Sequence, residues 1–345
     1  MVEKQSSWTR RLVRGAGYTV SGLMALAVAA AAVGYVAQSV LTAQDRKNYP
    51  PLGIMVDIGG RALHLYCTGD PNAAGPTIVL EAGAYGSSLT WFRIQPVLAE
   101  RYRVCSYDRA GFGWSEAAPD ERSLALDAED ARRMLDASDE SGPYLLVGMS
   151  YGGVIVRQFH QDYPDLVAGL VFVDPTRLEA RRTMTEERKE RRRKAIAARH
   201  LQAWLSQFGV WRLVAASRRA APSDMSADLF ARFKAVRSST RYFRARAKTT
   251  ERLFRDLEQP GLLDDQDFGD LPITVLSENS EPGTPDMLEK HGHHRTLAER
   301  STNRRHYIVD GATHRSFLAE QKDARVVNRA VSQLWQIINE TQAGP

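Results

Sequence analysis

The sequence predicts an α/β protein in which a mostly parallel sheet carries helices on both faces. Short apolar runs closed by turn residues alternate with helix-like runs over residues 53–174, and the alternation resumes after residue 271. A helix-rich stretch at 175–270 interrupts this rhythm. The chain has 345 residues, of which 43% are apolar and 25% charged, so it is long enough to bury a large core and is not a disordered protein.

The first feature along the chain is a run of 30 residues, 15–44, without a charged side chain. A bilayer core of about 30 Å is crossed by about 20 helical residues, so we expect a transmembrane helix at 18–41. The stub at 1–17 carries four basic residues and one acidic residue, and cationic flanks stay preferentially in the cytoplasm. We therefore expect a single-pass protein of the cell membrane, with its N-terminus cytoplasmic and its catalytic region extracytoplasmic.

A cleaved signal peptide is the alternative, because small residues with Ala-x-Ala spacing are frequent in this run. Its length favours an anchor, since secretory apolar regions usually have about 7–15 residues. Both interpretations place residues 48–345 outside the cytoplasm. Cys67 and Cys105 suit an oxidising compartment, where they can pair, and equally a reducing one, where cysteines are small buried apolar residues.

A Pro/Gly linker at 48–53 leads into the first part of the expected core, 48–174. Its helix-like runs, with apolar residues at three-to-four spacing, are 123–138 and 151–162. Its strand-like runs end at turn residues and lie at 53–58, 62–67, 77–80, 102–106, 144–148 and 168–173.

The insertion at 175–270 shows helix-like runs at 179–216 and 226–258. Because a helical insertion in an α/β core usually covers the mouth of the active site, we expect residues 175–270 to form a cap. The second part of the core, 271–345, follows with strands at 272–277 and 304–309 and a helix at 318–340.

The formal net charge of +5 is unevenly distributed. Residues 48–174 hold 9 basic and 17 acidic residues, whereas the insertion holds 22 basic and 13 acidic. Its most basic part, 177–199, is interleaved with glutamates, lacks stacking aromatics and is expected outside the cytoplasm, so no nucleic-acid partner is predicted. A solvated helix, or a surface facing anionic lipid headgroups, fits it better. The oligomeric state is not indicated by the sequence.

The motif Gly148-Met-Ser150-Tyr-Gly152 reads G-x-S-x-G. A strand-like run ends directly before it and a helix-like run begins directly after it, which is the context of a nucleophile on a strained strand-to-helix turn. We therefore predict Ser150 as the catalytic nucleophile.

A serine hydroxyl needs an adjacent imidazole to take its proton. Among eight histidines, His314 lies in a short loop between the last expected strand and the final helix, at the sheet edge where Ser150 also emerges. We predict His314 as the base. His291, His293 and His294 lie in a segment expected to be a polar loop, where no carboxylate or cysteine completes a metal set, so neither a metal nor an organic cofactor is expected.

Two carboxylates could orient the base. Asp174 ends the strand after the nucleophile, and Glu281 follows the strand after the insertion; Asp174 is favoured because it directly ends a strand and Asp is the commoner acid. Two backbone N–H groups should stabilise the oxyanion. We assign them to Tyr151, after the nucleophile, and to Ala84, in a loop where Gly83 permits the turn.

Residues 52–340 resemble the α/β-hydrolase family. Glu81-Ala-Gly-Ala stands where that family has its oxyanion loop, residues 107–115 are similar to its D-x-R-G-x-G-x-S segment, and residues 148–152 are similar to its nucleophile elbow. The insertion stands where the family carries its helical cap. The usual acid of the family would align with Glu281, whereas other members place the acid at the position of Asp174.

The resemblance implies an eight-stranded sheet with strand order 1-2-4-3-5-6-7-8 and an antiparallel second strand. Cys67 would then neighbour Cys105 and form a cross-strand disulfide. Ser150 in place of an aspartate argues against the dehalogenase and epoxide-hydrolase branches of the family.

The expected function is that of a membrane-anchored serine hydrolase that cleaves an ester or related acyl bond of a small molecule through an acyl-enzyme. Other chemistries of the same fold remain open, namely aminopeptidase, carbon–carbon hydrolase and acyltransferase activity. An inactive tethered binding protein is the alternative from another class.

Overall fold

In the computed structural model of the chain, residues 2–118, 122–178, 185–217, 225–259, 262–263 and 266–343 are described. The chain divides into two compact units. One unit comprises Met1–Pro50 and Leu201–Thr240, and the other comprises Pro51–His200 and Arg241–Pro345. The expected cap residues therefore contribute to both units.

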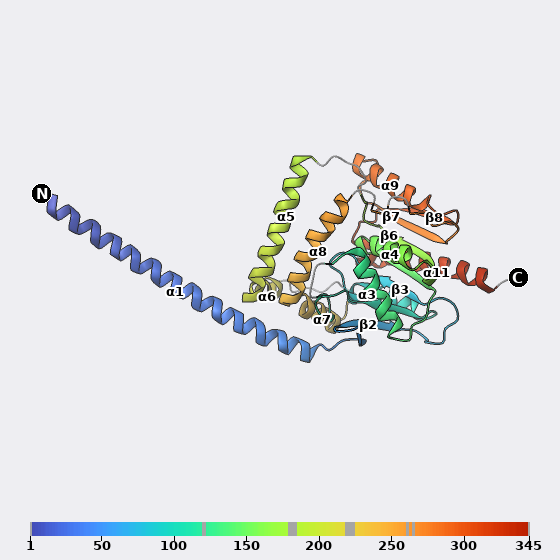
Figure 1. The fold of residues 1–345 in the computed structure, drawn as a ribbon, viewed down its shortest axis with the longest axis horizontal. Helices are drawn as coiled ribbons and strands as arrows, with labels where there is room; N and C mark the ends of the chain where they lie inside the picture. Colours follow the sequence, from blue (N-terminus) through green and yellow to red (C-terminus); the bar gives the residue numbers. More distant parts are fainter. Residues whose placement is uncertain are drawn as a thin grey trace. The chain divides into compact units, whose positions relative to one another are not determined.

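The larger unit is built on one sheet of eight strands in the order β1-β2-β4-β3-β5-β6-β7-β8, as the resemblance implies (Figure 1). The first two pairings, β1 with β2 and β2 with β4, are antiparallel, and all others are parallel. The fold class predicted from the sequence is confirmed. The strands are β1 (Ile54–Asp57), β2 (Ala62–Thr68), β3 (Ile78–Glu81), β4 (Val104–Tyr107), β5 (Tyr144–Met149), β6 (Val167–Val173), β7 (Ile273–Asn279) and β8 (Arg304–Asp310).

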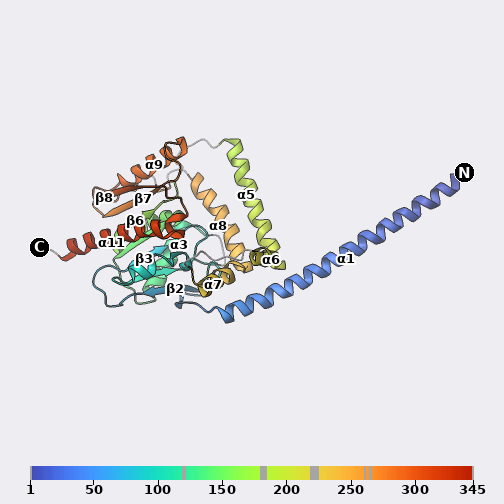
Figure 2. The same cartoon turned by 180° about the vertical axis from the view of Figure 1, so that it is seen from behind.

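Helices cover both faces of this sheet (Figures 1 and 2). On one face, α3 (Leu124–Asp136), α4 (Tyr151–Asp162) and α9 (Pro285–Ala298) pack against the strands through buried side chains such as Met134, Phe159 and Leu297. On the other face lie η1 (Ser88–Trp91), α2 (Gln95–Leu98), α10 (Ser316–Ala319) and α11 (Gln321–Ala343). The short η2 (Pro164–Leu166) precedes β6. The central strands β3, β4 and β5 are buried at every position, and most of their residues are apolar.

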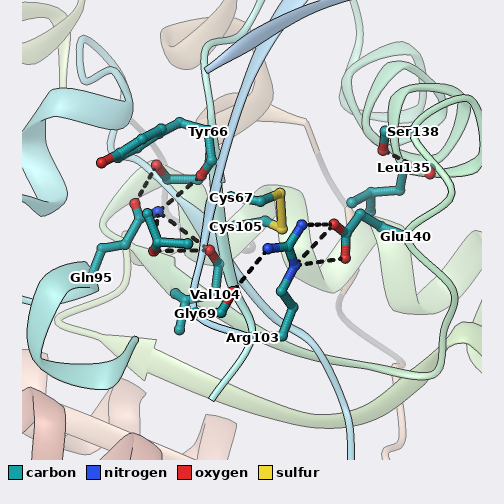
Figure 3. The surroundings of a disulfide bond; sticks show 12 residues. Tyr66, Cys67, Gly69, Gln95, Arg103, Val104, Cys105, Leu135, Ser138 and Glu140 are labelled. Atoms are coloured by element: carbon teal, nitrogen blue, oxygen red, sulfur yellow. Dashed lines mark hydrogen bonds and ion pairs between the residues drawn. A yellow bond between two sulfur atoms is a disulfide. The ribbon is translucent and has the colours of Figure 1, made fainter. Parts of the chain in front are cut away.

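The expected disulfide is present. The register of β2 and β4 places Cys67 opposite Cys105, and the two sulfur atoms are bonded (Figure 3). Beside them, Arg103 pairs with Glu140 and its Nη1 donates to the carbonyl of Gly69 at 3.1 Å. The disulfide therefore joins an outer antiparallel strand to the parallel centre of the sheet.

Within the larger unit, α8 (Thr240–Glu258) is fixed to the sheet domain from Arg241 onward. Nη2 of Arg252 donates to Asp127 on α3 at 2.5 Å, and both side chains are more than nine-tenths buried. The hydroxyls of Tyr85 and Thr250 are 2.9 Å apart. Because the ion pair is buried, this attachment is screened by salt much less than an exposed pair would be.

The smaller unit contains α1 (Val2–Asn48), the end of α5 (Glu186–Leu205), η3 (Ser206–Phe208), α6 (Val210–Ser217) and α7 (Ala227–Arg237). Within α1, residues Ala16–Asn48 include an 18-residue window with a mean hydropathy of 2.0, and this helix is long and apolar enough for a membrane span or a signal sequence.

The helices of the insertion at 175–270 are shorter than expected. The run predicted at 179–216 is interrupted at Gly209, which has a left-handed φ of 73° and ends η3. The run predicted at 226–258 is interrupted at Ser238, which caps α7 before α8 begins. Residues 179–184 of the first run lie outside the described residues.

Candidate active site

Ser150 occupies a sharp turn between β5 and α4. Its backbone has φ 54° and ψ −122°, a conformation that L-residues rarely adopt. A Cβ on Gly148 would lie 2.7 Å from the Gly152 carbonyl oxygen, and a Cβ on Gly152 would lie 2.5 Å from the Glu81 carbonyl oxygen. The two glycines are therefore required for the turn to close against β3.

The loop after β3 passes directly beside Ser150, the predicted nucleophile. A Cβ on Gly83 would contact the Cβ of Ser150 at 3.4 Å. The guanidinium of Arg109 donates to three successive carbonyls of this loop, at 2.6 Å to Ala82, 2.7 Å to Gly83 and 3.1 Å to Ala84. Because these carbonyls are held by Arg109, the path of the loop beside Ser150 is fixed.

Arg109 also pairs with the buried carboxylate of Glu81, which accepts a hydrogen bond from the hydroxyl of Tyr107. Burial raises the pKa of Glu81 to about 7, although the charge of Arg109 opposes the shift. Glu81 and Arg109 are thus a buried pair beneath the loop that carries Ala84.

Tyr151 is the first residue of α4, where a backbone N–H has no partner within the helix. Its hydroxyl donates to Asp256 at 2.6 Å and accepts from Nε of Arg252 at 3.1 Å. Burial raises the pKa of Tyr151, so its hydroxyl stays protonated. The residue next to the nucleophile is therefore tied to α8 through its side chain.

The structure brings Asp174 and His314 together. His314 lies in the loop after β8, and its Nδ1 is 2.5 Å from Oδ2 of Asp174, at the end of β6. The other oxygen, Oδ1, accepts the backbone N–H of Glu278 at 3.1 Å. Burial acts to raise the pKa of Asp174, but the hydrogen bond from His314 and the charge of Lys290 outweigh it and lower this pKa to about 2. The carboxylate is charged and oriented.

The alternative acid, Glu281, is exposed in the loop after β7, where its backbone carbonyl accepts from the Thr284 hydroxyl at 3.0 Å. The structure pairs His314 with Asp174 and not with this carboxylate. The Ser150 hydroxyl is 3.4 Å from Oγ1 of Thr176, and among the described contacts it makes no hydrogen bond to His314. The His314 side chain is 42% exposed, so its ring is accessible at this edge of the sheet.

Two residues that the sequence did not indicate complete this cluster. Nζ of Lys290, on α9, lies 2.6 Å from Oδ2 of Asp174 and 2.5 Å from Oε1 of Glu278. Oε2 of Glu278 accepts the backbone N–H of His314 at 2.7 Å. Lys290 and Glu278 therefore connect the acid to the loop that carries the base. No sequence motif identifies them, because only their contacts with Asp174 and His314, which are distant in the sequence, show their place in the cluster.

The histidine cluster lies in a helix, so the expected polar loop at His291, His293 and His294 is wrong. Thr284 caps α9 with a hydrogen bond to the Met287 N–H, and Pro285 occupies the first turn, where it is compatible with a helix.

His294 is buried between the Ser277 hydroxyl and the Pro175 carbonyl, whereas His291 contacts the Glu278 carbonyl. Burial lowers the pKa of His294 to about 4. A different group, Asp174, Glu278 and His314, has donor atoms within 4.8 Å of one another, but the ammonium of Lys290 already lies against both carboxylates.

Comparison with known proteins identifies the family. The family model described as the alpha/beta hydrolase fold matches residues 76–320. An esterase from Thermogutta terrifontis superposes with a TM-score of 0.59 at 18% identity, over 83% of this chain and 98% of that one. A bromoperoxidase from Bacillus anthracis superposes with a TM-score of 0.59 at 20% identity, over 82% and 99%. These likenesses concern the fold.

A fungal protein named "Probable transporter efuK", from Hormonema carpetanum, is 35% identical over 126 residues, which are 35% of this chain and 18% of that protein. The chain spans only 18% to 41% of the first curated relatives that it matches. With a family match over most of its length and the strand order described above, this chain belongs to the α/β-hydrolase family.

Proposed function

We propose that this protein is a membrane-anchored serine hydrolase that cleaves an ester or a related acyl bond of a small molecule. One observation carries the proposal. Ser150 is held in a strained turn at the carboxyl end of β5, and the Asp174–His314 pair lies at the carboxyl ends of β6 and β8 in the same parallel sheet. Membership of the family and the likeness to an esterase support hydrolase chemistry.

In the proposed acylation step, the Ser150 oxygen attacks the acyl carbonyl carbon and its proton passes to Nε2 of His314. Asp174 accepts the Nδ1 hydrogen and stabilises the imidazolium that forms. The carbonyl electron pair moves onto oxygen, where the N–H groups of Ala84 and Tyr151 stabilise the negative charge. When the tetrahedral intermediate collapses, the bond to the leaving group breaks and the leaving group takes the proton from His314.

In the proposed deacylation step, water loses a proton to His314 and attacks the acyl-enzyme. The same two N–H groups stabilise the second tetrahedral intermediate. Its collapse breaks the bond to the Ser150 oxygen, which recovers the proton from His314, and the free acid leaves. The step consumes one water and needs no other reactant.

The proposed activity is tested on the purified full-length protein with p-nitrophenyl esters of increasing acyl length. Hydrolysis should be lost in Ser150→Ala and in His314→Ala, and retained in the controls Ser39→Ala and His200→Gln, which alter exposed residues outside the candidate site. A folded wild-type protein without activity on esters, thioesters or amides would support the inactive binding protein instead.

We also propose that α1 is a retained anchor and that residues 48–345 are extracytoplasmic. Two observations support this. The disulfide suits an oxidising compartment, and the C-terminal part of α1 is built into the smaller unit, where Gln38 donates to the Ser238 carbonyl at 2.9 Å. The protein extracted from membranes should have the intact mass of the full chain. A mass lacking the apolar run would show cleavage.

A further inference from the structure

In the smaller unit, η3 contacts α1 at a position inside the apolar run of that helix. A Cβ on Gly34 would lie 2.6 Å from the Phe208 carbonyl oxygen, so η3 lies directly on the backbone of α1. Residues 16–34 of a helix span about 27 Å at about 1.5 Å per residue. If the membrane span begins at residue 16, a bilayer core of about 30 Å therefore ends near Gly34. If the span begins later, more of the residues that contact η3 lie within the core.

Polar contacts continue along the next turns of α1. Arg212, on α6, donates to Gln38 at 2.7 Å, to Thr42 at 3.1 Å and to Asp45 at 2.6 Å. The guanidinium is thus paired and hydrogen-bonded within the protein, which lowers the cost of placing it at a membrane boundary. These contacts hold α6 beside the end of the apolar run.

Large apolar side chains are exposed on the same two elements that flank η3. We call this set the apolar patch. Leu201 and Trp204 lie one turn apart near the end of α5, and Trp204 packs edge-on against Phe208, with ring centroids 5.1 Å apart. The members and their exposed fractions are Leu201 56%, Trp204 56%, Leu213 76% and Val214 43%.

We propose that the apolar patch inserts into the outer boundary of the lipid bilayer, so that the end of α5 and α6 form a monotopic surface continuous with the span. The proposal rests on the proposed anchor. Continuity identifies the occupant, because the patch flanks the element that touches α1 at Gly34, within its apolar run. Tryptophan is enriched at this depth, where its ring has an apolar body and a polar edge.

The experiment uses the full chain reconstituted in phosphatidylcholine/phosphatidylglycerol vesicles. The only two cysteines form the disulfide, so a cysteine introduced elsewhere is the single reactive thiol. A nitroxide is attached to Leu213→Cys, to Leu26→Cys in the apolar run, and to Ala125→Cys, an exposed helical position of the larger unit. Collision rates with oxygen, which partitions into lipid, and with a water-soluble nickel chelate then report the depth of each label.

The oxygen-to-nickel ratio should be several-fold higher at Leu213→Cys than at Ala125→Cys, and highest at Leu26→Cys. A ratio at Leu213→Cys equal to that at Ala125→Cys, with Leu26→Cys deep, overturns the inference and leaves the anchor standing. A water-exposed Leu26→Cys label overturns the anchor and the inference together. Dipolar broadening between Leu213→Cys labels that persists in detergent would identify a second copy of the chain as the occupant and also overturn the inference.

Discussion

Replacing Lys290 with methionine should move the acid limb of the pH–activity profile to higher pH. Burial raises the pKa of Asp174, but the hydrogen bond from His314 and the charge of Lys290 together lower it to about 2. Nζ of Lys290 lies against the same oxygen of Asp174 that contacts Nδ1 of His314. Removing the charge of Lys290 raises the pKa of Asp174, so the orienting carboxylate, and activity with it, is lost at a higher pH than in the wild type.

The size of the shift follows from the geometry. Nζ of Lys290 is 2.6 Å from Oδ2 of Asp174, and Nδ1 of His314 is 2.5 Å from the same atom. Two unit charges at the distance between Lys290 and Asp174 interact by about 6 kcal/mol at an effective dielectric constant of about 20. Because water replaces most of the lost interaction at this edge of the sheet, the expected change is about 1 kcal/mol, or a rise of about one unit in the pKa of Asp174.

Glu278→Gln provides the opposite test. It removes a negative charge that shares the Lys290 ammonium with Asp174, but keeps an oxygen able to accept the backbone N–H of His314. The acid limb should move to lower pH. Lys290→Arg, which preserves the charge, and Glu281→Gln, which alters an exposed carboxylate, are the matched controls. The other titratable groups near the cluster are His291, His294 and His306, and none of these variants alters them.

The assay is kcat/KM for a short p-nitrophenyl ester between pH 2 and pH 10, a range that includes the pKa of Asp174. Shifts of opposite sign in Lys290→Met and Glu278→Gln are the expected result. Losses of activity in both variants without movement of the limb would show that the pair only supports the fold, and shifts of the same sign would refute the electrostatic reasoning.

Three further predictions concern the acid, the pH dependence of stability and the disulfide. Asp174→Asn should lower kcat by about 10⁴-fold, as loss of the orienting carboxylate does in serine hydrolases. Glu281→Gln should keep a kcat near that of the wild type. The reverse pattern would assign the acid to Glu281. The hydrogen bond from His314 and the charge of Lys290 outweigh burial and hold the pKa of Asp174 at about 2, below its ordinary value of 3.8. The charged form of Asp174 therefore stabilises the fold by about 2 kcal/mol above pH 4, and this contribution is lost as the pH falls toward 2. Thermal unfolding across this window should be less pH-dependent in Asp174→Asn, and an unchanged slope would contradict the assignment. The double variant Cys67→Ala/Cys105→Ala removes a disulfide between residues separated by 38 in the sequence, and its free energy of unfolding in urea should be lower by about 4 kcal/mol. An unchanged midpoint would show that the disulfide does not constrain the unfolded chain.

The features that the sequence predicts are those governed by local rules. The glycines at 148 and 152 flank the serine because any side chain there would meet backbone atoms, and this requirement is visible as a motif. The disulfide followed from strand order, since the family arrangement places Cys67 beside Cys105 and the register confirms it. The motif carries its geometry in its spacing, whereas the disulfide was predicted only through the resemblance to the family.

The features that the sequence did not predict depend on tertiary contacts or on competing local signals. Lys290 meets Asp174 only because α9 packs beside β7 and β8, and no sequence spacing predicts that contact. The polar character of the histidine segment predicts a loop, but the Thr284-Pro285 cap and the packing of His294 against Ser277 favour a helix. Arg252 was one of many basic residues in the insertion, and only the fold distinguishes its buried partner, Asp127.

The nucleophilic role of Ser150 is tested most directly by labelling the full-length protein with a serine-reactive fluorophosphonate and mapping the modified peptide by mass spectrometry. A single adduct on Ser150 is expected, and it should be absent from Ser150→Ala and much slower to form in His314→Ala. A folded wild-type protein that forms no adduct, or an adduct on another serine that persists in Ser150→Ala, would contradict the proposed mechanism.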